Sequence, residues 1–509
     1  MGEVISGARR VSSEALAARA ANAASGLKSL GVGAGDRVAL YLRNDIAFFE
    51  AAFGAGQLGA YAVPVNWHYT PAEAAYLFND SGAKAVVIHA DLLGPIREAI
   101  PAGVAVLTVD TPPEIAAAYG LDPERCAAPP GATAWDHWVD RFAPAAEALE
   151  PPGAIIYTSG TTGHPKGVKR SPPSAAQTQA SQGMLMAAFG LAPDAGIVTV
   201  VTGPMYHSAP NAYGLTMARL GARVILQPRF DPEGLLSLIE TERVTHLHMV
   251  PIMFNRLLKL PAEVRRRYDL SSLKFVVHAA APCPPHEKRA MIEWWGPVIY
   301  EYYGATETGA IVLCNSEEWL AHPGTVGKAL PGCVVKVVDE AGNELPRGEV
   351  GEIVGRNVNL ADFTYHGDDD KRRRAEKAGL IIPGDIGWMD ADGFLYLCDR
   401  SKDMIISGGV NIYPAEIEAE LHGLKGVVDC AVFGIPDAEY GEAICAVIQP
   451  DPAVALTEAD VRGHLRGRVA GYKMPRLIEF AADLPREDSG KIFKRKLREP
   501  YWAGLERRI

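Results

Sequence analysis

Residues able to bind a phosphate are concentrated in one short stretch, YTSGTTGHPKGV, at residues 157–168. Its glycines allow the backbone to approach a ligand closely. Successive backbone N–H groups, together with hydroxyls and a lysine, can surround phosphate oxygens. The residues that can contact such an anion are Thr158, Ser159, Gly160, Thr161, Thr162, Gly163 and Lys166. The stretch therefore predicts a binding loop for a large anion rich in oxygen.

This loop differs from the Walker A loop, which reads G-x-x-x-x-G-K-[ST] and binds Mg²⁺ through its last hydroxyl. Here Pro165 precedes Lys166, and Gly167 stands where the hydroxyl residue would be. The alternative is a flexible surface loop, but a plain turn needs only one or two such residues. We therefore expect a phosphate site of another type.

The elements around the loop alternate between strand and helix from residue 11 to about residue 300. Thr70, Pro71 and Glu73 form a capping box with proline at the first helical position, so a helix is predicted to begin there. The predicted strands are RVALYL, YAVPVN, AKAVVIHA and VAVLTVD before the loop, and GIVTVV, ARVILQP, THLHMVP, LKFVVHAA and PVIYEYYG after it. This recurrence predicts an α/β fold with two mostly parallel sheets flanked by helices.

The pattern changes after about residue 320, where short strands alternate with Gly, Pro and Asn turns. We expect a small antiparallel β-barrel or sandwich at about 320–398. From about residue 403 the pattern is again mixed α and β. The chain is therefore divided into a large N-terminal domain, 1–401, and a smaller α+β C-terminal domain, 402–509.

Composition excludes some classes of protein. The 509 residues are 48% hydrophobic and 22% charged, which is ordinary for a globular protein with several domains. A formal net charge of −11 disfavours a nucleic-acid partner. No run approaches the ~18 apolar residues of a membrane span, so we expect a cytoplasmic protein.

The spacing of the cysteine and histidine residues predicts no metal site. Seven cysteines are scattered without a C-x-x-C pair, which indicates reduced thiols. His246 and His248 alternate on a predicted strand, and they lack a third partner that would complete a ligand set.

Several further motifs follow the loop in order. They are MYHSAP at 205–210, AAAP at 279–282, YYGATE at 302–307, GDIGWMDADGFLYLCDRSKDMIISGGVNIYPAEIE at 384–418, and REDSGKIFKRKL at 486–497. Together with the loop they resemble the adenylate-forming superfamily of acyl-CoA synthetases, peptide-synthetase adenylation domains and luciferases. The resemblance covers nearly the whole chain.

The resemblance implies a two-step reaction. A carboxylate attacks the α-phosphate of ATP to give acyl-AMP and pyrophosphate, and a thiol then displaces AMP. Glu307 is the implied Mg²⁺ ligand, and Thr306 donates to the α-phosphate. Lys491 bridges the carboxylate and the α-phosphate, and His207 is a wall of the acyl pocket that seats the carboxylate. Charge neutralisation and positioning are expected to dominate such a reaction.

The nucleotide contacts are implied in the same way. Adenine lies against Tyr303, with Gly304, Ala280 and Ala281 beside it, and the ribose hydroxyls are bound by Asp385 with support from Arg400. The C-terminal domain is expected to rotate about a hinge at Lys402. It presents Lys491 for the first step and Gly408 and Gly409, beside the pantetheine path of CoA, for the second.

The sequence departs from the family pattern at three positions. His278 precedes the alanines where glycine is usual, Pro383 replaces the threonine of T-G-D, and Asp399 replaces the glycine of G-R. None of these changes removes a charged catalytic group.

The resulting hypothesis is an ATP-dependent acyl-CoA synthetase that uses Mg²⁺ and CoA. Its pocket candidates at 205–214 and 249–254 are apolar or small and lack arginine, which favours a monocarboxylic acid with an apolar body. A fatty acid is favoured; an aryl acid, or a separate carrier-protein thiol as the acceptor, is the alternative. A catalytically silent nucleotide-binding protein is a third hypothesis, and Lys491, Glu307 and Thr306 argue against it. A homodimer is the candidate oligomeric state.

Overall fold

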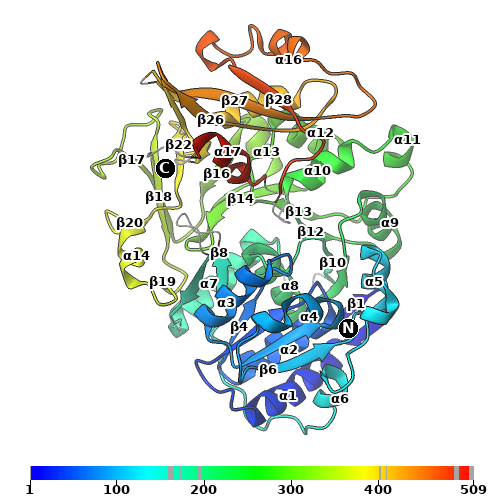
Figure 1. The fold of residues 1–509 in the computed structure, drawn as a ribbon. Helices are drawn as coiled ribbons and strands as arrows, with labels where there is room; N and C mark the ends of the chain where they lie inside the picture. The colour runs from blue at the N-terminus through cyan, green and yellow to red at the C-terminus, as the bar shows by residue number, and fades with distance from the viewer. Residues whose placement is uncertain are drawn as a thin grey trace.

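The computed structural model describes residues 2–158, 165–171, 173–191, 196–400, 403–408, 410–486 and 492–503, except the side chains of Ala188, Asp369, Lys371 and Arg400. Within them the chain folds as mixed α/β, with a large N-terminal part built on parallel sheets and a smaller C-terminal domain (Figure 1). The predicted fold class is confirmed.

The first parallel sheet lies in the N-terminal third. Its strand order is β4-β3-β5-β6-β7, and every neighbouring pair is parallel. The strands are β3 (Arg37–Tyr41), β4 (Tyr61–Pro64), β5 (Ala85–His89), β6 (Ala105–Val109) and β7 (Thr133–Ala134). The helices around them are α1 (Ser13–Ser29), α2 (Ile46–Gln57), α3 (Pro71–Ser81), α4 (Ala90–Ile96), α5 (Pro113–Tyr119) and α6 (Trp135–Val139). The predicted capping box at Thr70 and Glu73 is present at the start of α3.

The second sheet begins with parallel strands in the order β1-β11-β10-β12-β13-β14, with β2 antiparallel at its edge. These strands are β1 (Glu3–Ser6), β2 (Arg9–Ser12), β10 (Val198–Val201), β11 (Arg223–Leu226), β12 (His246–Met249), β13 (Phe275–His278) and β14 (Ile299–Ala305). The accompanying helices are α7 (Ala175–Ala188), α8 (Ser208–Arg219), α9 (Pro232–Glu242), α10 (Pro251–Leu258), α11 (Ala262–Arg265) and α12 (Pro285–Trp295).

The largest core lies between these two sheets. It joins Leu40 of the first sheet and Val224 of the second through Phe48 and Phe49 of α2. Helix α2 is buried on nearly all sides, as expected of a helix between two layers. Burial of this apolar surface fixes the relative position of the two sheets and of the loops at their ends.

The second sheet continues beyond β14 as antiparallel strands in the order β15-β16-β23-β22-β18-β21-β20, with β17 paired to β18. Their bounds are β15 (Gly309–Cys314), β16 (Thr325–Ala329), β17 (Cys333–Val338), β18 (Gly351–Asn357), β20 (Glu376–Lys377), β21 (Leu380–Ile381), β22 (Asp385–Met389) and β23 (Leu395–Arg400). A separate sheet joins β8 (Ile156–Thr158), β9 (Lys166–Arg170) and β19 (Phe363–Tyr365). Helices α13 (Ser316–Ala321) and α14 (Asp369–Arg374) lie within this region.

The C-terminal domain has its own sheet and core, drawn in orange and red at the top of Figure 1. Its strands are β24 (Ile405–Ser407), β25 (Val410–Ile412), β26 (Val427–Asp437), β27 (Gly441–Pro450) and β28 (Leu477–Phe480). Its helices are α15 (Pro414–His422), α16 (Glu458–Leu465) and α17 (Lys494–Trp502). The Lys259 ammonium, just after α10, donates to the carbonyl of Val428 at 2.8 Å, so this domain contacts the N-terminal part.

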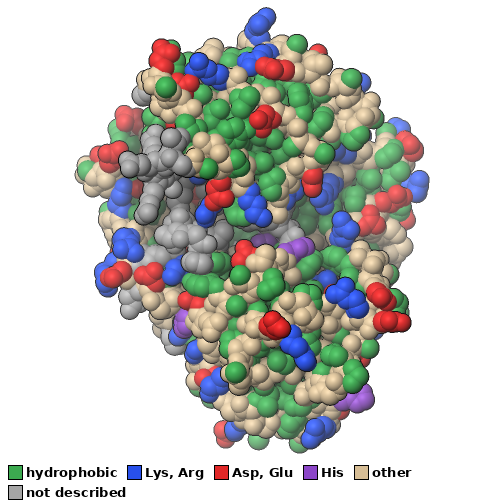
Figure 2. Space-filling model, viewed as in Figure 1, with side chains coloured by type: hydrophobic (Ala, Val, Ile, Leu, Met, Phe, Trp, Pro, Cys, Tyr) green, Lys and Arg blue, Asp and Glu red, His purple; other side chains and the backbone are tan. Residues whose placement is uncertain are grey.

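The described residues were compared with two features of other protein classes, namely membrane-spanning helices and surface patches of a single charge. None of their helices has both the length and the apolar character needed to span a bilayer. Basic and acidic side chains are interspersed over the face in Figure 2, rather than gathered by sign.

Candidate active site

The predicted phosphate loop connects two paired strands. Thr158 at the end of β8 pairs with Lys166 at the start of β9, so the two ends of the loop lie side by side. A Cβ at Gly167 would lie 2.8 Å from a methyl carbon of Ile155, which explains glycine at that position. The Lys166 ammonium lies 3.7 Å from an Asp368 carboxylate oxygen. The loop residues Ser159 to Gly163 lie outside the described residues.

The turn between β14 and β15 carries Thr306 and Glu307. The Thr306 hydroxyl donates to the hydroxyl of Ser208 at 3.2 Å, which places this turn beside the start of α8. A Cβ at Gly304 would lie 1.9 Å from the carbonyl oxygen of Gly309, so only glycine allows the two strands to approach this closely. The turn is thereby held where β14 ends and β15 begins.

Two residues that the sequence analysis missed support this turn. The guanidinium of Arg170 donates to the carbonyls of Thr306 at 2.9 Å and Glu307 at 3.0 Å. The Tyr365 hydroxyl donates to Glu307 Oε1 at 2.9 Å. The pKa of the Arg170 guanidinium is lowered, because the effect of burial exceeds the opposite effect of the nearby Glu307 carboxylate. Arg170 ends the strand after the glycine-rich loop, which could have marked it, but no sequence signal marks Tyr365.

The donor set at Glu307 fits a magnesium ion. The Tyr365 hydroxyl orients one of its oxygens, so the carboxylate is held in an orientation in which it could serve as a hard oxygen ligand. Mg²⁺ is usually held by one or two carboxylates with substrate phosphates and water completing its shell.

Away from Glu307, two groups of three side chains lie close enough together to hold a metal ion among the described residues. One is His422, Asp429 and Cys430, and the other is His322, Asp390 and Asp392.

The predicted adenine and ribose residues meet in the structure. The Tyr303 hydroxyl of β14 donates to Asp385 Oδ2 of β22 at 2.7 Å, and the Tyr303 side chain is buried. The backbone of Asp385 pairs with that of Arg400 on β23. The sheet therefore brings together Tyr303 and Asp385, residues 82 positions apart in the sequence.

The short segment after β13 has unusual backbone geometry. Ala280 has φ +74°, in the left-handed region that costs a residue with a Cβ about 1–2 kcal/mol. Ala280 is exposed and Ala281 is half-buried. Strain of this kind accumulates at functional sites, where the surrounding structure maintains it.

His207 immediately precedes α8 and is half-buried. Its ring lies 4.5 Å from that of Tyr206, measured between centroids. The neighbouring Ser208 reaches the Thr306 hydroxyl. The structure thus places the predicted acyl-pocket residue next to the predicted phosphate residues.

The departures at His278 and Asp399 have structural explanations. His278 is buried, its ring packs against Phe254 at 5.2 Å, and burial lowers its pKa well below the usual value. It also lies 3.6 Å from Glu301, which pairs with Lys288 at 2.5 Å. The Asp399 carboxylate accepts a hydrogen bond from the backbone N–H of Ala415 at 2.9 Å, at the start of α15. Nothing in the structure explains Pro383.

The C-terminal candidates are only partly described. Gly408 has φ +59°, and its N–H donates to the Tyr440 carbonyl at 2.8 Å. Lys402, Gly409 and Lys491 lie outside the described residues, as does the side chain of Arg400.

The residues on either side of Lys491 are anchored within the C-terminal domain. Arg486 and Ile492 form an antiparallel bridge, and the Phe493 N–H donates to the Pro485 carbonyl at 2.7 Å. Arg486 also forms an ion pair with Asp429, next to the Val428 carbonyl that accepts from Lys259. The segment carrying Lys491 therefore begins and ends near the contact with the N-terminal part.

Other features lie away from these residues. His246 is hydrogen-bonded to Thr245 and to the Gly190 carbonyl, which is consistent with the structural role expected for it.

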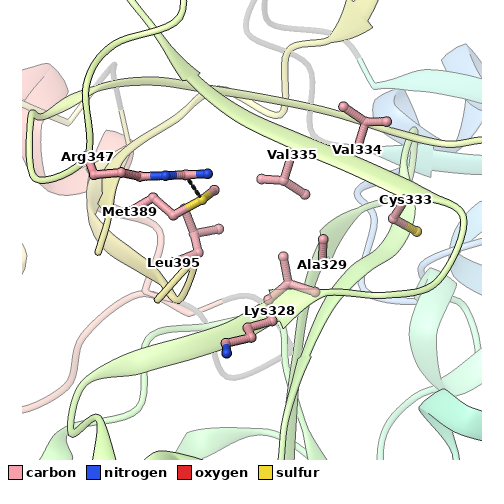
Figure 3. A pocket seen from close by; sticks show the side chains of 10 residues that line it. Lys328, Ala329, Cys333, Val334, Val335, Arg347, Met389 and Leu395 are labelled. Carbon is pink, nitrogen blue, oxygen red and sulfur yellow. Dashed lines mark hydrogen bonds between the residues drawn. The ribbon is translucent and has the colours of Figure 1, made fainter. Parts of the chain in front are cut away.

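A cavity of about 390 Å³ lies in the antiparallel region (Figure 3). Val312, Lys328, Ala329, Cys333, Val334, Val335, Arg347, Met389, Gly393 and Leu395 line it, and Arg347 extends along Met389. None of the predicted site residues is among them.

Two family models match the chain. The model of the AMP-binding enzyme matches residues 3–362, and that of the AMP-binding enzyme C-terminal domain matches residues 416–491. The match supports the predicted resemblance over most of the chain.

Curated relatives and solved structures agree with these matches. A feruloyl-CoA synthase of Amycolatopsis is 33% identical over 495 residues, covering 96% of this chain and 93% of the relative. A long-chain-fatty-acid–CoA ligase of Mycobacterium tuberculosis is 34% identical over 497 residues, covering 94% of this chain and 90% of the relative. The crystal structure of ATP-bound MatB from Rhodopseudomonas palustris superposes with a TM-score of 0.82 at 30% identity, covering 98% of this chain and 95% of that one.

Proposed function

Because the chain belongs to the AMP-binding enzyme family, we propose that it is an AMP-forming ligase that joins an apolar monocarboxylic acid to coenzyme A. The two curated relatives described above are both named as CoA-ester-forming enzymes, one for an aryl acid and one for fatty acids. Their shared chemistry supports the acid–CoA ligase, whereas their different acids leave the choice between aliphatic and aryl substrates to experiment.

The turn at Thr306 and Glu307 is the observation that supports this function most strongly. Arg170 and Tyr365 fix this turn, and Thr306 faces Ser208 at the start of α8. Groups held in place before the substrate binds lose little free energy to reorganisation during the reaction. The turn can therefore bind the α-phosphate of ATP beside the carboxylate that attacks it.

In the first step, a carboxylate oxygen bonds to the α-phosphorus while the bond to the pyrophosphate oxygen breaks. We assign Thr306 as a donor to the α-phosphate and His207 as the residue that seats the carboxylate. Glu307 would hold Mg²⁺, which neutralises phosphate charge when it is bound. The loop residues Thr158 and Lys166 would bind the outgoing pyrophosphate.

In the second step, the CoA thiol attacks the acyl carbonyl and loses its proton, and AMP leaves with the oxygen that joined it to the acyl group. We propose that Lys491 serves the first step and that Gly408 and Gly409 border the path of CoA in the second. The domain would rotate about Lys402 between them. Such motion is a recognised way to complete a site in stages.

The proposed function is tested by measuring AMP and thioester formation with a panel of carboxylic acids, with and without CoA. The expected result is AMP release that depends on ATP, the acid and CoA together. Glu307→Gln should reduce this rate by at least about a hundredfold, because charge stabilisation of this kind contributes strongly. The matched control, Glu317→Gln on the exposed surface of α13, should not change it. AMP release that required a carrier protein in place of CoA would contradict the assignment.

A further inference from the structure

The side chain of Asn44 joins the first parallel sheet to the segment that carries His207. Asn44 follows β3 and directly precedes Asp45, the N-cap residue of α2. Its amide nitrogen donates to the carbonyl of Gly203 at 2.8 Å, and its amide oxygen accepts from the N–H of Met205 at 2.9 Å. These partners lie 159 and 161 positions away in the sequence, so the contact depends on how the two sheets pack together.

Both hydrogen bonds of this amide lie away from water. Asn44 is 6% exposed and Met205 is 1% exposed, and Gly203 is also buried. Pro204, between the two partners, has no N–H to donate. Because a buried backbone group that loses its partner costs free energy, the Gly203 carbonyl and the Met205 N–H both favour the position in which the amide reaches them.

The turn that presents Asn44 is itself fixed by its neighbours. The Asp45 carboxylate caps α2 and lies 3.2 Å from the imidazole of His89. The backbone N–H of Arg43 donates to the other nitrogen of that imidazole at 3.2 Å. The Arg43 guanidinium then forms two hydrogen bonds of 2.9 Å with the carboxylate of Asp91. The amide is therefore presented to the second sheet from a fixed position.

The segment held by Asn44 leads directly into the proposed active site. The His207 N–H donates to the Pro204 carbonyl at 3.1 Å, so His207 belongs to the same turn as the residues that the amide contacts. Ser208 begins α8, and its hydroxyl accepts from the Thr306 hydroxyl at 3.2 Å. A shift of the held segment would therefore displace the side chain proposed to seat the substrate carboxylate.

We propose that Asn44 is a positioning residue for the adenylation step, which acts by holding the turn before α8 in place rather than by touching a substrate. This inference rests on the proposed function. An amide suits the task because it supplies one donor group and one acceptor side by side, which match the Gly203 carbonyl and the Met205 N–H. Misplacement of a positioning group by 1 Å can lower a rate by about a hundredfold.

The location of these contacts predicts an effect on the acid rather than on the nucleotide. Tyr303 and Asp385, the proposed adenine and ribose residues, are bonded to each other on β14 and β22. The hydrogen bonds of the Asn44 amide end instead on the segment between β10 and α8. Loss of the amide should therefore weaken the use of the acid and leave ATP binding nearly unchanged.

The test uses Asn44→Leu, which roughly keeps the size of the side chain but removes its donor and its acceptor. Acid-dependent exchange between ATP and pyrophosphate, with the better of cinnamate and dodecanoate, gives kcat/KM for the acid. Equilibrium dialysis with MgATP and no acid gives Kd for ATP. Asn44→Leu should lower kcat/KM for the acid at least about thirtyfold, the effect of two neutral hydrogen bonds, and should change Kd for ATP by less than about twofold.

Asn44→Asp is the conservative second variant. It keeps the shape of the side chain and the acceptor for the Met205 N–H, but an ionised carboxylate has no donor for the Gly203 carbonyl. It should show the same pattern, with kcat/KM for the acid lowered at least about fivefold and Kd for ATP within about twofold of the wild-type value. Thermal unfolding checks each variant, and Asn44→Asp decides the question if Asn44→Leu does not fold.

The matched control is Ser272→Ala, which also removes a buried hydrogen bond. The Ser272 hydroxyl donates to the Val244 carbonyl at 2.7 Å, before the parallel strands β12 and β13 begin, whereas the Asn44 contacts lie beyond the end of β10. This control should change neither quantity. Wild-type values of both quantities in folded Asn44→Leu, or equal weakening of acid use and ATP binding, would overturn this inference alone. A wild-type protein without acid-dependent exchange would overturn the proposed function and this inference with it.

Discussion

Replacing Arg170 with glutamine tests whether the turn at Thr306 and Glu307 must be held in place for adenylation. The Arg170 guanidinium donates to three carbonyls, those of Thr306 at 2.9 Å, Glu307 at 3.0 Å and Ala361 at 3.0 Å. Arg170→Gln shortens the side chain and removes its charge, so that it can keep only one of these bonds.

The size of the effect follows from the two bonds that are lost. A hydrogen bond from a charged donor contributes about 1.5 kcal/mol or more, so two such bonds contribute about 3 kcal/mol. At 1.36 kcal/mol per tenfold change, this corresponds to about a 150-fold lower kcat/KM for the first step if the bonds act on the turn. If they served only to stabilise the fold, the same 3 kcal/mol would appear in the free energy of unfolding instead.

The assay is acid-dependent exchange between ATP and pyrophosphate, with urea unfolding measured in parallel. Arg266→Gln is the matched control, because the exposed Arg266 guanidinium donates to the Ala262 carbonyl at 3.2 Å, away from the turn. If the folded Arg170→Gln variant exchanged pyrophosphate at the wild-type rate, adenylation would not depend on Arg170 holding the turn.

Three further predictions concern the C-terminal domain, the Glu307 carboxylate and the buried His248. Lys491→Ala should abolish pyrophosphate exchange yet still convert supplied acyl-AMP and CoA to thioester. Gly409→Leu should keep pyrophosphate exchange but fail to form the thioester. Equal slowing of both half-reactions by Lys491→Ala would contradict domain alternation. Glu307→Gln should raise the Mg²⁺ concentration for half-maximal exchange by at least about tenfold, measured by Mg²⁺ titration against Glu317→Gln, and an unchanged titration would remove Glu307 as a metal ligand. Burial lowers the pKa of His248 to about 4 in the folded protein, whereas the imidazole in the unfolded chain has the ordinary value of about 6.5. Between these two pH values the unfolded chain binds a proton that the folded protein does not bind. The free energy of unfolding should therefore fall as the pH decreases from about 6.5 to about 4. His248→Gln should lose less stability over that interval in urea unfolding, and an equal loss would place the titration elsewhere.

Local signals made much of the fold predictable. The capping box at Thr70 depends on residues three positions apart, and the structure contains it as expected. The apolar strands of both parallel sheets were also recognisable, because buried parallel strands are apolar over their whole length. The match of motif order to a known family then predicted the larger arrangement.

The contacts that hold the site together were not predictable from local signals. Arg170 meets Glu307 across 137 positions, and Tyr365 meets it across 58, because separate sheets converge at this turn. The bond between His248 and Tyr302 likewise depends on the order of β12, β13 and β14 in the sheet. Such contacts depend on topology, which residue spacing does not reveal.

The chemistry proposed for this chain is the attack of a substrate carboxylate oxygen on the α-phosphate of ATP. Its most direct test is to supply the acid with both carboxylate oxygens labelled with ¹⁸O and to analyse the products by mass spectrometry. Because AMP leaves with the oxygen that joined it to the acyl group, one ¹⁸O atom should appear in each AMP and the other should remain in the thioester carbonyl. Label in inorganic phosphate, together with ADP as the nucleotide product, would contradict attack at the α-phosphate.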